Sequence, residues 1–347
     1  MTTKVCILGH YGDGKNLLNG QTIKTKIITR ALQQQLGQDQ VQTIDTHGGI
    51  KNLLKAPFQV LYALKNSKNV LIFPAHNGLR VYAPLLFLLK HIFKNRKLHY
   101  SVIGGWLPQF LTQHKWLARI LKHFDNIYVE TNTMCRALEK QGFTNICVMK
   151  NCKDLKALTE QDLIYEKEKP LRLCTFSRVM KEKGIETAIR SVEHINSQLG
   201  CAAFSLDIYG QIDSAQEEWF DSLMQNCPAY VRYCGCVDMD KSVEVLRHYF
   251  ALIFPTHFYT EGIPGTVIDA YAAGLPVISA KWESYADVID DGITGIGYTF
   301  DNTEELDALL FQIAEDPQIL LSMKTNCIKK AKEYAPLTAI QIMTARF

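Results

Sequence analysis

The sequence has no apolar stretch long enough to cross a lipid bilayer. Its longest apolar run, VYAPLLFLL at 81–89, ends at Lys90, whereas a membrane-spanning helix needs about 20 apolar residues. The opening residues, MTTKVCILGH, run directly into a strand-like segment, without the separate apolar region and cleavage site of a signal peptide. We therefore expect neither a transmembrane helix nor a secretory leader.

Cysteines at metal-binding or redox spacing are also missing. The ten cysteines are scattered, only Cys234 and Cys236 lie close together, and no CxxC pair occurs. A zinc site needs spaced clusters, and a disulfide framework needs a secreted context. We expect reduced, mostly buried cysteines in a cytoplasmic protein, and no metal site.

The net charge is small, at +3, but the two halves of the chain differ in sign. Residues 1–150 contain 20 Lys and Arg against six Asp and Glu, a balance of +14, and the remainder contains 18 against 29, a balance of −11. Such a split indicates a polyanion or an anionic membrane beside the basic half. We expect a membrane rather than a nucleic acid.

Short apolar runs alternate with longer amphipathic ones along the chain, and 347 residues are enough for two domains. The runs that we interpret as buried strands form two series: KVCILG (4–9), NVLIFPA (69–75), KLHYSVIGG (97–105) and NIYVET (126–131), then LRLCTFSRV (171–179), FSLDIYG (204–210), VRYCGCV (231–237), FALIFPT (250–256) and LPVISA (275–280). Helical segments between them, such as 20–37, predict parallel sheets with right-handed crossovers.

The fold class is therefore α/β, with two doubly wound, Rossmann-like domains facing each other across a cleft. We place the domains at 1–160 and 161–330, and we expect 331–347 to form a helix that packs back on the first domain. In such sheets ligands bind at the carboxyl ends of the strands.

A glycine-rich segment, GHYGDGKN at 9–16, follows the first strand. It nearly matches the phosphate-binding loop G-x-x-x-x-G-K-[ST], but Asn16 stands where a hydroxyl should meet Mg²⁺. An NTPase therefore stays an alternative to a plain glycine-rich turn. In either case amides such as that of Gly14, and the helix start at Gly20, Gln21 and Thr22, could contact an anionic ligand.

Two cations follow the first strand of the second series, in TFSRVMKEKGIETAIRSV (175–192). Arg178 lies at the strand end, and Lys183 lies just before Gly184 and a helix. A planar guanidinium and an ammonium at this edge suit a diphosphate. The alternative is a solvated surface turn.

Two carboxylates flank a glycine- and proline-containing segment in FYTEGIPGTVIDAYAAGLPVI (258–278). Pro264 favours a helix start there, and Gly274 favours its end. Glu261 would then lie in the preceding loop and Asp269 in the second helical turn. Loop amides can meet an anion, and each carboxylate can accept hydrogen bonds from sugar or ribose hydroxyls. Alternatively, Asp269 only favours the helix start and Glu261 is a loop charge.

These segments together resemble a known family. EGIPGTVIDAYAAGLPVI is similar to the E-x7-E signature of retaining glycosyltransferases of family 4, which have the GT-B fold, and SRVMKEKG is similar to their G-R-L-x-x-x-K-G segment, with Ser177 for the first Gly. The resemblance covers most of 170–300. It extends more loosely to NGQTIKT (19–25) and FDNIYVETNTM (124–134).

The resemblance implies a role for each matching residue. Arg178 and Lys183 would bind the diphosphate of a nucleotide sugar and stabilise the charge of the leaving group, and Glu261 would contact the transferred sugar. His76, in FPAHNG (73–78), resembles the histidine near the donor sugar, although a lone histidine after a strand is often structural. The donor-binding residues would be Gly14, Gly20, Gln21, Thr22, Gly235, Val237, Gly262, Ile263, Pro264, Gly265, Thr266 and Asp269.

Within this set, backbone groups near Gly235 and Val237 would hold the base, and Asp269, which stands for the usual Glu, would bind the ribose. Transfer would retain the anomeric configuration and need no metal. The donor would be a UDP-sugar, bound by the second domain, and the first domain would bind the acceptor.

The acceptor should meet the basic first half. In LLFLLKHIFKNRKLHY (85–100) and LPQFLTQHKWLARILKHF (107–124), apolar and basic residues alternate at roughly helical spacing. This is typical of an interfacial helix on anionic lipid, and also of a helix packed on a sheet with a solvated basic rim. We expect a saccharide or lipid-linked saccharide acceptor. A P-loop hydrolase and a non-catalytic sugar-nucleotide binding module remain the competing hypotheses.

Overall fold

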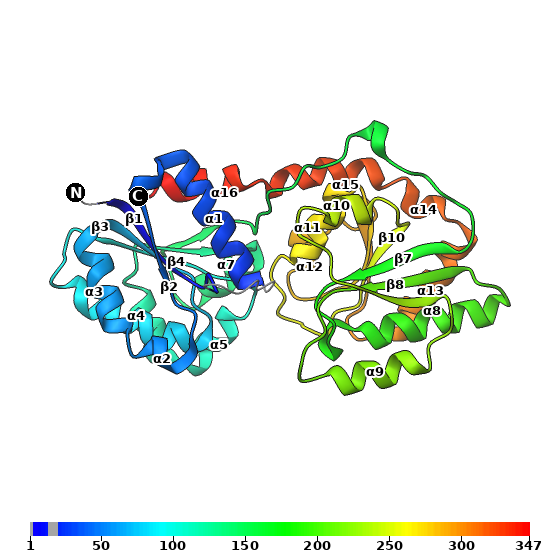
Figure 1. Ribbon diagram of the computed structural model, residues 1–347, viewed down its shortest axis with the longest axis horizontal. Helices are drawn as coiled ribbons and strands as arrows, with labels where there is room; N and C mark the ends of the chain where they lie inside the picture. Colours follow the sequence, from blue (N-terminus) through cyan, green and yellow to red (C-terminus); the bar gives the residue numbers. More distant parts are fainter. Residues whose placement is uncertain (1–2, 13–19) are drawn as a thin grey trace. The chain divides into compact units, whose positions relative to one another are not determined.

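The chain folds into two α/β units in this computed structural model, which describes residues 3–12 and 20–347 (Figure 1). The first unit comprises Met1–Asp154 together with Tyr334–Phe347, and the second comprises Leu155–Glu333. No helix among the described residues combines the length and the apolar character that crossing a bilayer requires.

The first unit is built around one parallel sheet with the strand order β2-β1-β3-β4-β5-β6. Its elements are β1 (Thr3–Gly9), α1 (Gly20–Leu36), η1 (Gln38–Gln40), β2 (Val41–Asp45), α2 (Gly49–Leu53), α3 (Ala56–Asn66), β3 (Ser67–Ile72), α4 (His76–Lys90), β4 (Lys97–Ser101), α5 (Leu107–Gln113), α6 (Lys115–Leu121), β5 (Asn126–Val129), α7 (Asn132–Lys140), β6 (Ile146–Val148) and α16 (Pro336–Thr344).

Alternate side chains of the first sheet enter two separate cores, because successive residues of a strand point to opposite faces. From β1, Val5 and Ile7 pack with residues of α1 and α16. Cys6 and Leu8 pack on the other face with residues of α3 and α4. Figure 1 shows α1 beside α16, and these two helices cover a face that residues 334–347 help to close.

The second unit is built around a parallel sheet with the order β12-β11-β10-β7-β8-β9. Its elements are η2 (Glu160–Asp162), β7 (Leu171–Phe176), η3 (Lys181–Lys183), α8 (Ile185–Leu199), β8 (Phe204–Tyr209), α9 (Glu217–Gln225), β9 (Val231–Gly235), α10 (Ser242–Leu246), β10 (Ala251–Phe254), α11 (Gly265–Ala272), β11 (Val277–Ala280), α12 (Tyr285–Val288), β12 (Gly295–Tyr298), α13 (Thr303–Glu315), α14 (Gln318–Leu321), α15 (Lys324–Ala331) and η4 (Lys332–Tyr334), whose last residue belongs to the first unit.

Each sheet has a topological switch point, where the chain leaves a strand and later returns on its other side. In the first sheet this point lies between β1 and β3, and in the second it lies between β7 and β10. Ligands of doubly wound sheets bind at the carboxyl ends of the strands that meet there. The turns after β1, β3, β7 and β10 are therefore the places where a ligand site is expected.

The predicted fold class is confirmed, since both sheets are parallel and doubly wound. Three strands were missed: β2, β6 and β12. In β2, VQTID, only Val41 is buried, β6 has three residues, and β12, GIGY, contains two glycines. None of these is the continuous apolar run by which the other strands were found.

The ten cysteines are all free, as expected. The expectation that most are buried is wrong, because only Cys6, Cys152, Cys174 and Cys327 are buried. The others lie on helix α7, in loops, and on the two edge strands β6 and β9.

His99, in the middle of the first sheet, is buried with both ring nitrogens bonded. Its Nε2 lies 3.1 Å from Asn69 Oδ1, which only accepts, and its Nδ1 lies 3.1 Å from the Tyr128 hydroxyl. The ring is therefore neutral, with Nε2 donating and Nδ1 accepting. Burial lowers the pKa of His99 from 6.5 to about 3.

We expect acid to destabilise the first unit through His99. The unfolded chain takes up a proton near pH 6.5 and the folded chain only near pH 3, so this stability is complete above pH 6.5 and is lost between the two values. The loss is about 1.4 kcal/mol at a pH one unit below the unfolded pKa. Hydrogen exchange of β4 peptides, corrected for intrinsic rates, measures it. The loss should disappear in His99→Gln and persist in His194→Gln, which alters an exposed ring; equal losses in both variants would contradict the prediction.

Candidate functional site

Two loops meet at the switch point of the second sheet: the turn after β7 (177–184) and the loop after β10 (255–264). The His257 amide donates to the Glu182 carbonyl at 2.9 Å. Gly184 has φ 71°, and a Cβ there would lie 1.8 Å from the Pro255 carbonyl oxygen. Glycine at 184 thus permits both the left-handed backbone and the close approach of the two loops.

Lys183 and Glu261 form an ion pair where these loops meet. Their side chains are only 17% and 15% exposed, and the Thr256 hydroxyl also donates to Glu261 Oε1 at 3.3 Å. The Lys183 ammonium lies 5.0 Å from the centre of the Phe258 ring, close enough for a cation–π interaction. The turn and the loop therefore hold one cation and one anion together in a partly dehydrated position.

Arg178 follows β7 in the same turn but has a different partner. Its Nη1 lies 3.2 Å from Asp213 Oδ2, and its side chain is 55% exposed. An exposed ion pair of this kind is weak. The guanidinium can therefore exchange Asp213 for a more highly charged ligand.

The amino terminus of α11 lies at the end of the loop that contains Glu261. Pro264 is the N-cap and the helix begins at Gly265, so the helix start expected near Pro264 is confirmed. No side chain caps this end. The Thr266 hydroxyl is buried and has no hydrogen-bond partner among the described residues. An unused hydroxyl beside uncapped amides is suited to an anion.

Other predicted residues of this loop are less accessible. Gly262, Ile263 and Pro264 are buried, whereas Gly265 is partly exposed. Gly274, at φ 63°, follows the end of α11 as the sequence predicted.

Asp269 lies in the second turn of α11, as predicted, but its side chain is 1% exposed. Its Oδ1 accepts a hydrogen bond of 3.0 Å from the Ser242 hydroxyl of α10. This bond joins α11 to the first residue of α10. The ribose contact of Asp269 stays a prediction, and no sequence pattern singled out Ser242.

Gly235 and Val237 lie at and beyond the carboxyl end of the edge strand β9. The Gly235 carbonyl accepts from the Gly210 amide at 2.8 Å, and Val237 is half-buried. Both residues thus lie at the carboxyl edge of the sheet, and their contact with a base stays a prediction.

His76 lies at the switch point of the first sheet, as the first residue of α4 after β3. Its ring stacks on Trp106 with centroids 3.8 Å apart, and it meets the Phe110 ring edge-on at 5.0 Å. Burial lowers the pKa of His76, and Arg80 and His114 lower it further. The aromatic neighbours hold the position of the ring, and burial with the two nearby basic side chains favours its neutral form.

The start of α1 lies beside the same switch point. The Gln21 side-chain amide donates to the Phe73 carbonyl, just after β3, at 2.9 Å. Thr22 is buried, and Gly20 is exposed. Gly14, with Lys15 and Asn16 of the near phosphate-loop motif, lies outside the described residues.

A histidine pair in the first unit was missed from the sequence. His10 Nδ1 lies 2.7 Å from the Thr22 hydroxyl, and His10 Nε2 lies 2.9 Å from His47 Nδ1. Asp45 Oδ1 accepts from the amides of Tyr11 and His47. Burial lowers the pKa of His10, and the neighbouring His47 adds to this. The pair could have been predicted because each histidine follows a strand, but β2, which precedes His47, was not recognised as a strand.

A buried ion pair joins the two segments of the first unit that carried the looser resemblance. Lys24, from NGQTIKT, donates to Glu130 Oε1, from FDNIYVETNTM, at 2.6 Å and to the Val102 carbonyl at 2.9 Å. The two side chains are 2% and 1% exposed. The residues are 106 positions apart in the chain, so the two segments form one structural feature.

The two apolar and basic segments of the first unit differ in part from expectation. The helix expected over 85–100 ends at Lys90 in α4, and Lys97 begins β4, because Leu98 and Tyr100 alternate into the sheet core. The segment 107–124 forms two helices, α5 and α6, that break at His114. Its apolar residues Leu107, Phe110, Leu111, Leu117, Leu121 and Phe124 are buried in the core. For 107–124 the alternative of a helix packed on the sheet is confirmed.

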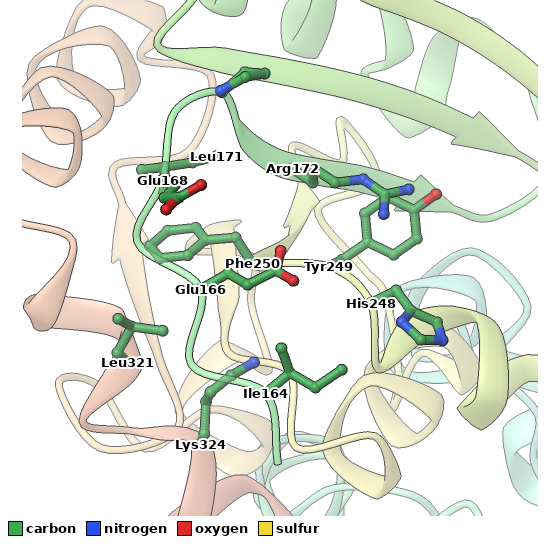
Figure 2. Close-up of a pocket in the computed structure, with 11 residues that line it drawn as sticks. Ile164, Glu166, Glu168, Leu171, Arg172, His248, Tyr249, Phe250, Leu321 and Lys324 are labelled. Carbon is green, nitrogen blue, oxygen red and sulfur yellow. The ribbon is translucent and has the colours of Figure 1, made fainter. Parts of the chain in front are cut away.

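A pocket with about 290 Å³ of open space lies at the opposite edge of the second sheet (Figure 2). It is lined by Arg172 at the start of β7, by Phe250 just before β10, and by Glu166 and the buried Lys324. Burial lowers the pKa of Lys324 to about 8, an effect that Cys327 and Glu166 partly offset. Because the predicted residues follow the carboxyl ends of the strands, this pocket is separate from them.

Comparison with known proteins agrees with this geometry. Residues 159–334, about half of the chain, match the family described as glycosyl transferases group 1. The amylovoran biosynthesis glycosyltransferase AmsK of Erwinia amylovora is 23% identical over 235 residues, which cover 65% of this chain and 52% of AmsK. The chain thus spans about half the length of this curated relative.

Solved structures extend the similarity to the whole chain. HepE from Anabaena, crystallised with UDP and glucose, matches with a TM-score of 0.75 at 15% identity, covering 99% of this chain and 98% of HepE. The lipopolysaccharide outer core galactosyltransferase WaaB, in its apo form, matches with a TM-score of 0.73 at 14% identity, covering 99% of each chain. At these identities the likeness shows the GT-B fold.

Proposed function

The chain belongs to the family of glycosyl transferases group 1, and on that premise we propose that it transfers a sugar from a UDP-sugar to a saccharide or lipid-linked saccharide. The transfer retains the anomeric configuration, needs no metal and takes place at the cytoplasmic face of a membrane. The products are the glycosylated acceptor, UDP and one proton.

One observation carries this proposal. The switch point of the second sheet brings together Lys183, Glu261 and the uncapped start of α11 with the unused hydroxyl of Thr266. A diphosphate has more negative charge than a carboxylate, so it can take the Lys183 ammonium from Glu261 while the amides and hydroxyl at α11 bind its oxygens. Arg178, whose present partner is an exposed carboxylate, can add a second cation.

The same exchange gives Glu261 its role. Once Lys183 binds the diphosphate, the Glu261 carboxylate is free to accept hydrogen bonds from hydroxyls of the transferred sugar. As the bond between the anomeric carbon and the phosphate oxygen breaks, negative charge grows on the diphosphate. Lys183, Arg178 and the α11 amides then stabilise the charge that develops in the transition state. For His76 of the first unit we propose, from the family resemblance alone, a contact with the donor sugar.

The choice of uridine rests on relatives. HepE, which shares the fold, was crystallised with UDP and glucose, and TarM, also of this fold, was crystallised with UDP and α-GlcNAc-glycerol. Gly235 and Val237 are the backbone groups that we propose for the base, and Asp269 with Ser242 for the ribose. The first unit is the proposed acceptor side.

A thermal-shift screen against UDP, other nucleotides and UDP-sugars tests the proposal, because a ligand at about 100 times its Kd stabilises the fold by roughly 2.7 kcal/mol. The hit is then incubated with and without EDTA, and transfer and hydrolysis are followed by mass spectrometry. We expect stabilisation by UDP and slow donor hydrolysis that EDTA does not abolish. Mg²⁺-dependent ATP turnover that is lost in Lys15→Ala would favour the P-loop hydrolase. Donor binding with neither transfer nor hydrolysis would favour the binding module.

A further inference from the structure

Helix α3 of the first unit has apolar residues on two opposite faces. Ala56, Val60, Ala63 and Leu64 are buried against the sheet. On the outer side, Phe58 is 75% exposed, Leu61 43% and Tyr62 50%. Residues three and four apart share a helix face, so these three side chains form one outward stripe. A helix that is apolar on all sides is ordinarily buried, and this one leaves half of its apolar surface in water.

The segments next to α3 expose further apolar side chains. Leu54, just before the helix, is 75% exposed. Helix α4 packs beside α3, where the Tyr82 hydroxyl donates to Gln59 Oε1 at 2.7 Å and Arg96 Nε donates to the Leu64 carbonyl at 2.8 Å. Near this second contact, the end of α4 and the following turn expose two more apolar side chains, Leu88 at 62% and Ile92 at 72%. We call these six residues, Leu54, Phe58, Leu61, Tyr62, Leu88 and Ile92, the α3 surface.

The segment of the chain that contains the α3 surface has positive charge only, and at the end of α4 its Lys90 bonds the carboxylate of Asp125 at 2.7 Å. Residues 46–124 contain 12 Lys and Arg and not one Asp or Glu. Lys55 and Lys65 lie at the two ends of α3, and Lys68 and Lys94 follow α3 and α4; all four are exposed. Among the described residues, none of these four lysines has an acidic partner within ion-pair distance.

We propose that the α3 surface docks the protein onto an anionic lipid bilayer, with Leu54 and Phe58 inserting at the boundary of headgroups and acyl chains. Exposed apolar side chains flanked by lysines without acidic partners are the composition that interfacial binding requires. A second copy of the chain fits less well, because a two-fold interface would bring the same basic surface against itself. The inference rests on the part of the proposed function that sets the transfer at a membrane face, and it adds the surface of the first unit that contacts the lipid.

Vesicle flotation tests this surface without any donor or acceptor. The probes are phosphatidylcholine vesicles, and vesicles with about one-third phosphatidylglycerol. We expect retention on the anionic vesicles that falls as salt is added. The double variant Leu54→Ser/Phe58→Ser should reduce that retention about tenfold or more, since it removes two inserting side chains. Leu337→Ser is the matched control: Leu337 is 60% exposed on α16, over the opposite face of the sheet, and its replacement should leave retention unchanged.

Each alternative outcome is decisive. Equal retention on neutral and anionic vesicles, or unchanged retention of the double variant, would overturn the proposal. So would a concentration-dependent dimer without vesicle binding that the double variant abolishes, because the α3 surface would then be an interface between copies. Both replaced side chains are largely exposed, so the variant should keep the wild-type melting temperature. Failure here leaves donor binding by the second unit unaffected, so the two proposals are tested separately.

Discussion

Replacing Lys183 by alanine is expected to lower kcat/KM for sugar transfer by about 10²–10³, the usual cost of removing one group that stabilises transition-state charge. The ammonium is mostly buried against Glu261 and the Phe258 ring. A cation on the exposed surface of the turn therefore cannot take its position beside the diphosphate. Donor stabilisation in the thermal-shift assay should fall as well, because the diphosphate loses its main cation. Arg178→Ala should act in the same direction.

Two comparisons separate this role from a purely structural one. Lys181→Ala removes a cation from the same turn, where it lies 5.6 Å from the centre of the Trp219 ring, and it should leave transfer nearly unchanged. Lys183→Ala also leaves Glu261 without its counter-ion. If the double variant Lys183→Ala/Glu261→Gln recovered activity, Lys183 would serve only to neutralise Glu261. Transfer at near wild-type rates in both cation variants, Arg178→Ala and Lys183→Ala, would end the mechanism proposed here.

Replacing Lys24 by methionine is expected to destabilise the first unit by about 3–5 kcal/mol, the typical cost of leaving a buried charge without its partner. Glu130 is 1% exposed, so water cannot replace the lost ammonium. The Val102 carbonyl loses its donor at the same time. Hydrogen exchange of peptides from α1 and β5 measures the loss.

The double variant Lys24→Met/Glu130→Leu separates the pair from the packing. Because it removes both charges, it should recover part of the stability that Lys24→Met loses. Lys241→Met, which breaks the exposed pair with Glu244, should change stability by less than about 0.5 kcal/mol. A double variant that is less stable than Lys24→Met would mean that packing, rather than the unpaired charge, sets the cost.

Local sequence patterns predicted most strands of the second unit and its candidate site, because the site residues lie in two continuous segments. About 20 residues are enough to predict the strand, turn, glycine and helix around Lys183, and the same holds for the loop and helix around Glu261. The contact between Lys183 and Glu261 cannot be predicted in this way, since the two residues are 78 positions apart. It depends on β7 and β10 being neighbours in the sheet, which is a property of the strand order.

The first unit was less predictable because its contacts also depend on strand order and helix packing. His47 follows β2, a strand with a single buried residue, and its bond to His10 depends on β2 lying beside β1. For 97–100 two expectations overlapped, a strand from Lys97 and a helical spacing that ran over 85–100; the strand is confirmed, and the helix ends at Lys90. Asp269 was placed correctly on α11, but its bond to Ser242 follows from how α10 packs.

Helix α16 has a consequence for how the protein is made. Its residues Ala339, Ile340 and Met343 complete the core that Ile28 and Leu32 of α1 share with the first sheet, yet the whole of the second unit is translated between them. Domains generally fold as the ribosome releases them, starting from the amino terminus. Here the order is reversed: the second unit can fold as one continuous stretch, while one face of the first sheet is covered by α1 but not by α16 until residues 336–344 emerge. During that interval the nascent chain is a natural client for chaperones that bind exposed apolar strands.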